Sequence, residues 1–193
     1  GTVGPGMEFD VGVGFNAAGM IGGDYSANIS VGSNDPSNPE VVVSLQLTVI
    51  GAPDVAVDMS SIDFQPIFVN YTDTSGFVIS NDGTDVLEVS SISVDNSVFS
   101  VLTSSATLAP GEEQAVQVVF SPTSTGDFSG TITLSTNDTD EETVSIPVSG
   151  SANAPPVIAV SVAALSDSLL TDGTASQTFT ITNDGSSDLN FSI

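Results

Sequence analysis

The sequence predicts an all-β chain made of two-sheet sandwiches in tandem. Three observations predict this fold class: apolar side chains recur at every second position, a pattern of about one hundred residues repeats, and the composition suits strands and turns. Val and Ile dominate the apolar residues, and Ser, Thr, Asn, Asp and Gly dominate the polar ones. No segment predicts a helix.

The repeat joins both ends of the chain to its middle. Residues 79–87 and 181–189 are offset by 102 and share five of nine positions, and Ala52-Pro53 matches Ala154-Pro155 at the same offset. A second set of matches, at offsets of 103 to 105, pairs the following early and central segments: Pro5-Gly6 with Pro110-Gly111, Phe15 with Phe120, and Asp24-Tyr25-Ser26 with Asp127-Phe128-Ser129. Two independent sets of matches with nearly the same period indicate a real repeat.

The period divides the chain into three units. Residues 53–152 are expected to form one complete repeat, residues 1–52 the C-terminal half of a preceding repeat, and residues 153–193 the N-terminal half of a following one. We therefore expect the chain to be a window through a longer tandem array. The prolines at Ala52-Pro53 and Ala154-Pro155-Pro156 are expected to stiffen the junctions.

The alternating segments predict the strands in order. They are 9–15, 25–31 and 43–49 in the first unit, 77–79, 87–89, 116–120, 128–134 and 144–148 in the second. Asn81-Asp82-Gly83 predicts a tight hairpin after Ile79, and Ser90-Ser91 predicts a bulge. About seven short strands per repeat, separated by turns, favour an immunoglobulin-like β-sandwich, with a closed barrel as the alternative.

The charge is entirely of one sign. The chain has 24 acidic residues and no Lys, Arg or His, so its formal net charge is −24 and its side chains cannot form salt bridges. Nucleic acids and anionic membranes are repelled and are excluded as partners, whereas cations, basic surfaces and neutral sugars remain. Cys is absent, and no apolar run approaches the roughly 20 residues that span a bilayer, so no membrane insertion is expected.

The motifs of the central unit resemble a known family. Residues 77–83 (Phe-Val-Ile-Ser-Asn-Asp-Gly), 108–112, 120–122 and 126–130 are similar to abnormal-spindle/Hydin-type Ig-like domains, of the choice-of-anchor D kind. Residues 4–15 and 23–36 resemble Ig-like repeats of large secreted bacterial proteins, which occur in surface adhesins and behind the catalytic domains of subtilisin-like proteases. The resemblance implies a fold and an extracellular location, but no ligand.

The residue inventory predicts no catalytic, cofactor-binding or metal-binding residue. Without His, Cys, Lys or Arg, the chain can form no Ser-His-Asp triad, Cys nucleophile, Schiff base or histidine zinc site, so we expect no enzyme. Weakly bound Ca²⁺ is the one cofactor left open, because carboxylates crowd one loop at Asp138, Asp140, Glu141 and Glu142, with Asp24, Asp35 and Glu40 at its counterpart. Ordinary turn formation explains these residues more simply.

Two further surface features are weak candidates for sugar chemistry. N-glycosylation sequons occur at Asn28, Asn70, Asn137 and Asn190, and Asn28 is expected to point outward between Ala27 and Ile29. Three aromatic residues, Phe64, Phe68 and Tyr71, could form a sugar platform, although core packing is the simpler interpretation.

The favoured function is a non-catalytic structural repeat of a long extracellular surface adhesin or filament. Its partners are then neighbouring repeats or copies of the same protein, joined by strand complementation between the partial units. The alternatives are a spacer module appended to a secreted hydrolase and a module that binds calcium or carbohydrate, with cations or surface glycans as partners.

Overall fold

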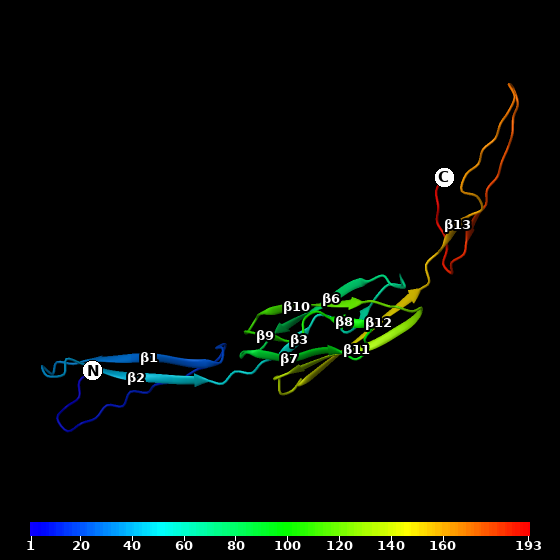
Figure 1. The fold of residues 1–193 in the computed structure, drawn as a ribbon. Coiled ribbons are helices and arrows are strands. Elements are labelled where there is room, and N and C mark those ends of the chain that lie inside the picture. Colours follow the sequence, from blue (N-terminus) through cyan, green and yellow to red (C-terminus); the bar gives the residue numbers. More distant parts are fainter.

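The computed structural model describes all residues, Gly1–Ile193, as strands and loops without a helix. Figure 1 shows three parts strung end to end: a two-stranded ribbon near the N-terminus, a central sandwich, and a C-terminal segment that carries β13 and β14. The predicted all-β class is confirmed.

The N-terminal ribbon pairs β1 (Gly23–Gly32) with β2 (Glu40–Val49) in antiparallel register, from Gly23 opposite Val49 to Gly32 opposite Glu40. Both strands lie where the alternation predicts them. Residues 9–15 are not a strand, so the strand predicted there is wrong. Their counterpart in the central unit lies between two hydrogen-bonded neighbours, whereas residues 9–15 have none, and Phe9 is 73% exposed.

The central part is a sandwich of two sheets. The first sheet has the order β3-β6-β10-β8, formed by Val55–Val57, Asp73–Asn81, Glu113–Phe120 and Phe99–Val101. The second has the order β4-β12-β11-β7-β9, with β5 also on β12; its strands are Ile62–Asp63, Thr143–Asn153, Gly126–Thr136, Leu87–Val94, Ala106–Leu108 and, for β5, Ile67–Phe68. The sheets are separate, so the barrel alternative is wrong.

The core fills the space between these sheets. It is a cluster of 17 buried apolar residues, all between Val55 and Val148. Alternation places them there: Val116, Val118 and Phe120 of β10 are at most 1% exposed, and the residues between them face outward. Phe120 is the centre of an aromatic group, with ring centroids 5.1 Å from Phe99, 5.4 Å from Phe64 and 5.9 Å from Phe128. Apolar burial therefore holds the two sheets together.

The turn at residues 81–83 is not the predicted hairpin. Strand β6 pairs with β3 and β10, whereas β7 pairs with β11 and β9, so the chain crosses between sheets at this turn. Gly83 lacks the positive φ of a type I′ turn. The buried Asn81 side chain stabilises the crossing instead: its Nδ2 donates to Asp85 O and Leu108 O at 2.8 and 2.9 Å, and its Oδ1 accepts from Gly83 N at 3.1 Å.

The predicted bulge is present. Ser91 pairs with Ser135 and Val89 with Thr136, so no residue of β11 lies opposite Ser90, whose hydroxyl donates to Ser135 O at 3.1 Å. This extra residue keeps Val89 and Ile92 buried on the same side of β7.

The C-terminal segment repeats the first strands of the sandwich. Strand β13 (Ile158–Val160) pairs with β14 (Ile181–Asn183), and Ile158 opposite Asn183 corresponds to Val55 opposite Asn81. Asn183 repeats two of the bonds of Asn81: its Nδ2 donates to Ser187 O at 2.7 Å and its Oδ1 accepts from Gly185 N at 3.0 Å. This register makes Pro155, not Ala154, the counterpart of Ala52, so the junctions are offset by 103 residues. The Ala-Pro sequence match at an offset of 102 is therefore one residue out of the structural register, because identical residues in a short linker need not occupy equivalent positions.

Candidate metal centre

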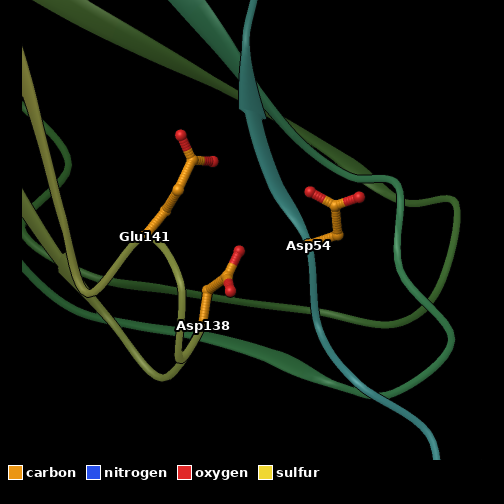
Figure 2. Close-up of side chains that lie close together, drawn as sticks. All are labelled: Asp54, Asp138 and Glu141. Atoms are coloured by element: carbon orange, nitrogen blue, oxygen red, sulfur yellow. The ribbon is translucent and has the colours of Figure 1, made fainter.

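Three carboxylates meet where the chain enters the sandwich. The acidic cluster consists of Asp54, just before β3, and Asp138 and Glu141, both in the β11–β12 loop; their nearest oxygens lie within 4.8 Å of one another. Figure 2 shows Asp138 and Glu141 leaving the same loop, with Asp54 on the neighbouring segment. Asp138 is buried, whereas Asp54 and Glu141 are exposed.

Local hydrogen bonds give the β11–β12 loop its shape. The Thr136 hydroxyl accepts from Asp138 N at 3.1 Å and donates to Glu141 O at 2.8 Å. Asn137 ties the loop to the neighbouring strand: its Oδ1 accepts from Glu88 N at 2.8 Å and its Nδ2 donates to Val86 O at 3.1 Å. Side chains that bond nearby backbone groups are what Thr and Asn contribute to turns, and here they hold Asp138 facing inward.

Asp138 joins two segments that lie far apart in the sequence. Its Oδ2 accepts from Val55 N at 2.9 Å, across 83 positions, and its Oδ1 accepts from Asp140 N at 3.3 Å. The bond from Val55 N, and then the side-chain hydrogen bond with Asp140, hold the pKa of Asp138 below its ordinary value. Asp138 is therefore ionised in the fold and anchors the start of β3 to the loop.

The pKa of Asp140 is shifted in the opposite direction. Its side-chain hydrogen bond with Asp138, followed by the charge of Asp138, raises the pKa of Asp140 above the ordinary value. Asp138, the inner carboxylate, therefore loses its proton before Asp140 as the pH rises.

The cluster can do little chemistry beyond this anchoring. Ca²⁺ takes about six to eight oxygen ligands, and the cluster offers three carboxylates, of which Asp138 already accepts two backbone hydrogen bonds. Asp138 and Glu141 of the predicted loop set belong to the cluster; Asp140 and Glu142 do not. Asp54 was missed by the sequence analysis, since only the folded register brings it to the loop.

The counterpart residues in the first unit stay apart. Asp24 Oδ1 accepts from the Thr48 hydroxyl at 2.6 Å, and Glu40 accepts from the Ser30 hydroxyl. Asp35 closes its own turn, with Oδ2 accepting from Asn38 Nδ2 at 3.0 Å and Oδ1 from Ser37 N at 2.8 Å; these bonds, in that order, lower the pKa of Asp35. This loop brings no three carboxylates together.

Of the aromatic residues and sequons proposed as sugar sites, some lie in the core and others on the surface. Phe64 is 7% exposed and packs in the core, so it cannot belong to a sugar platform. Phe68 and Tyr71 form an exposed edge-to-face pair, with centroids 6.3 Å apart. Asn28 is exposed on β1, as expected, whereas both polar atoms of the Asn137 side chain bond to backbone. A glycan at Asn137 would have to displace these bonds.

Removing the Asp138 charge is expected to lower stability in a pH-dependent way. Asp138→Asn leaves one acceptor oxygen for two backbone donors, which should cost about 1–3 kcal/mol in the free energy of unfolding at pH 7. Because the folded pKa is lowered, the contribution of Asp138 is present above the ordinary carboxyl value and is lost as the pH falls through the folded value. Urea unfolding of both proteins from pH 7 to pH 3 should show their difference shrinking below about pH 4.

Asp140→Asn is the matched control and should act with the opposite sign. The raised pKa of Asp140 means that its charge is disfavoured in the fold, so a neutral residue should leave stability at pH 7 unchanged or increased. Equal losses in the two variants would contradict the assigned role of Asp138.

Residues 53–151, about half of the chain and the whole of the sandwich core, match the family model of the HYDIN/CFA65/VesB-like Ig-like domain. The chain belongs to this family. The resemblance to Hydin-type Ig-like domains predicted from the motifs is confirmed, as is the immunoglobulin-like sandwich. Phe77, Ile79 and Phe120 of those motifs are core residues, and Asn81 is the buried crossing residue, so the HYDIN/CFA65/VesB-like signature describes folding rather than chemistry.

Solved structures similar to this HYDIN/CFA65/VesB-like chain come from several organisms. The ASH/PapD-like domain 7 of human CEP192 is 19% identical, with a TM-score of 0.45, over 52% of this chain and 86% of that one. A protein of unknown function from Porphyromonas gingivalis W83 is 16% identical, with a TM-score of 0.48, over 69% and 67%. The Vibrio cholerae VesB protease is 15% identical, with a TM-score of 0.41, over 51% of this chain and only 32% of its own.

No curated protein matches the chain. The structure contains no helix with the length and hydropathy needed to cross a bilayer.

Proposed function

We propose that the chain is a non-catalytic structural segment of a long extracellular surface protein, an adhesin or filament built from tandem Ig-like repeats. One observation supports this most: the two buried polar side chains, Asn81 and Asp138, both bond to backbone groups and hold the repeat together. No polar side chain is buried and left free for a substrate. The family of Ig-like domains is itself consistent with a non-catalytic module.

The arrangement of the units suits a load-bearing role. The chain enters the sandwich through β3 in one sheet and leaves through β12 in the other, and Figure 1 places these two points at opposite ends of the sandwich. A pull on the ends therefore passes through both sheets and their shared core. In single-molecule stretching we expect the central repeat to unfold in one step that releases about 100 residues, roughly 30 nm of chain. Gradual extension without such a step would contradict a load-bearing role.

Surface location is tested separately. Antibodies raised against the chain should label intact, unpermeabilised cells of the source organism. Labelling that requires permeabilisation would contradict the extracellular part of the proposal.

Salt is expected to stabilise the fold, because 24 acidic side chains repel one another and no basic side chain offsets them. Raising NaCl from about 0.01 to 1 M shortens the screening length from roughly 30 to 3 Å. We expect the Tm to rise by about 5 °C or more, which corresponds to about 1 kcal/mol in a domain of this size. CaCl₂ at matched ionic strength should act similarly. An extra calcium effect that Glu141→Gln removes would instead indicate a defined site.

The partial units suggest how partners would be joined. On β1–β2, facing residues such as Ile29 with Val43 and Val31 with Val41 form one apolar face, on which Val31 is 49% exposed. In the central sandwich the equivalent face of β11–β12 is covered by the sheet that contains β3 and β6, and β13–β14 are the counterparts of that pair. We propose that a neighbouring copy supplies its β13–β14 segment as strands of the missing opposite sheet, so that the two partial units complete one sandwich by strand complementation between copies.

Sedimentation tests this assembly. With repulsion screened in 0.5 M NaCl, the mass should rise with protein concentration, and Ile29→Asp should keep the chain monomeric. Monomers at all concentrations would overturn complementation between copies and favour strands from adjacent repeats of one polypeptide.

A second candidate function is a spacer in a secreted protease. Its support is the family match, whose description names VesB. Sequencing the complete gene distinguishes the two: many further repeats favour an adhesin or filament, and a protease domain favours the spacer.

A further inference from the structure

The central repeat is bonded directly to the unit before it. At this first joint, Gly22 N donates to Thr84 O at 2.7 Å, and Thr84 N donates to Ala52 O at 2.7 Å. The Thr84 hydroxyl also accepts from Ala52 N at 3.2 Å. The loop after Asn81 thus contacts both the start of β1 and the linker after β2. These bonds connect the sandwich to a unit that contributes no residue to its core.

Two glycines make this contact sterically feasible. A Cβ built on Gly51 would lie 2.5 Å from Thr84 O, closer than real Cβ contacts come. A Cβ on Gly22 would lie 3.0 Å from Gly51 N and 3.3 Å from Thr84 O. In both cases the obstructing atoms are backbone, which cannot rotate away. The first joint can therefore close only if position 51 lacks a side chain, and position 22 leaves little room for one.

The second joint has the same architecture and different residues. The paired registers of β1–β2 and β11–β12 place Thr125 at the position of Gly22 and Ala154 at that of Gly51, while Ser186 corresponds to Thr84. Both glycines are thus replaced by residues with a Cβ. One hydrogen bond crosses this joint, from the Ser187 hydroxyl to Ala154 O at 2.5 Å, but none joins Thr125 to Ser186. A cleft of about 480 Å³ lies between them instead, lined by Thr125, Gly126, Asp127, Ala152, Asn153, Ala154, Ser186 and Ser187.

We infer that the loop after the Asn-Asp-Gly motif is the surface by which each repeat docks on the preceding repeat, and that the glycine pair decides whether the joint locks. The first joint, with Gly22 and Gly51, is locked. The second, with Thr125 and Ala154, lacks these backbone bonds and is held only by the Ser187 hydroxyl, so it is open to bending. In Figure 1 the chain continues in nearly one direction across the first joint and turns away at the second. An array with both kinds of joint would alternate stiff and bending connections. This inference does not depend on the proposed surface function.

Amide hydrogen exchange measured by NMR on the full chain tests the locked joint. The Gly22 amide should exchange at least tenfold more slowly than the Thr125 amide, because only the former donates to the next repeat. In Gly51→Ala this protection should disappear, while the core amide of Val118 stays protected and shows that the sandwich is intact. Equal exchange of Gly22 and Thr125 in the unaltered chain would overturn the inference.

Distances across each joint test the role of the glycines independently. The chain has no Cys, so spin labels can be attached at engineered cysteines on exposed positions: Ser44→Cys with Ser100→Cys across the first joint, and Ser100→Cys with Thr182→Cys across the second. We expect a narrow distribution across the first joint and a broad one across the second. Gly51→Ala should broaden the first, and the double change Thr125→Gly with Ala154→Gly should narrow the second. Distance distributions that stay the same in these variants would show that the glycine pair does not determine the stiffness of the joint.

Discussion

Phe120→Ala is expected to destabilise the central sandwich by about 3–5 kcal/mol, a large part of the stability of a domain of this size. Phe120 is fully buried, and its ring packs against Phe64 and Phe99 between the sheets and against Phe128. The truncation removes apolar contacts from both sheets and leaves a cavity that the β strands cannot collapse to fill. Urea unfolding followed by far-UV circular dichroism should show the loss as a lower midpoint with an unchanged slope.

Phe15→Ala is the matched control, because Phe15 was aligned with Phe120 in the sequence repeat. Phe15 is 56% exposed and lies outside the sandwich core, so the unfolding transition of the central domain should hardly move. A similar loss from both substitutions would mean that the two units share one core, contrary to the structure.

Asn81→Ala should have the second largest effect, about 3 kcal/mol or more. The substitution leaves the carbonyls of Asp85 and Leu108 without their donor and Gly83 N without its acceptor, where water has little access. Because the side chain holds the crossing between the sheets, its loss should also loosen the loop that docks on the preceding unit. Chemical denaturation gives the first effect, and exchange of the Gly22 amide gives the second.

Asn183→Ala tests the same bonds in an open setting. Asn183 keeps two of these partners, Ser187 O and Gly185 N, but has no counterpart of Leu108 O, and its side chain is exposed, so water can replace the bonds. The unfolding of the central domain should be unaffected. A loss at Asn81 no larger than that at Asn183 would show that burial of the crossing residue adds nothing.

The acidic cluster shows the limit of sequence reasoning about the site. Asp138 and Glu141 could be selected because carboxylates crowd one loop, yet nothing local distinguishes Asp138, the buried one, from Asp140. The distinction arises from Val55 N, 83 residues away, which donates to Asp138. Asp54 could not be selected from the sequence for the same reason, since its place beside the loop depends on the pairing of β3 with β6.

The sequence by itself determined the all-β class, the period of the repeat and the faces of β10, β11 and β12, because strand alternation and turn composition are local properties. Only the tertiary structure decided which sheet each strand joins. The sequence Asn81-Asp82-Gly83 is typical of a hairpin turn, but the chain crosses between the sheets there, because the Asn81 side chain donates to Leu108 O. Residues 9–15 alternate as a strand would and form none, because ladder hydrogen bonds need a neighbour. The joints, too, were decided only by the tertiary structure, since the lack of a side chain at Gly22 and Gly51 matters only because the Thr84 carbonyl packs against them.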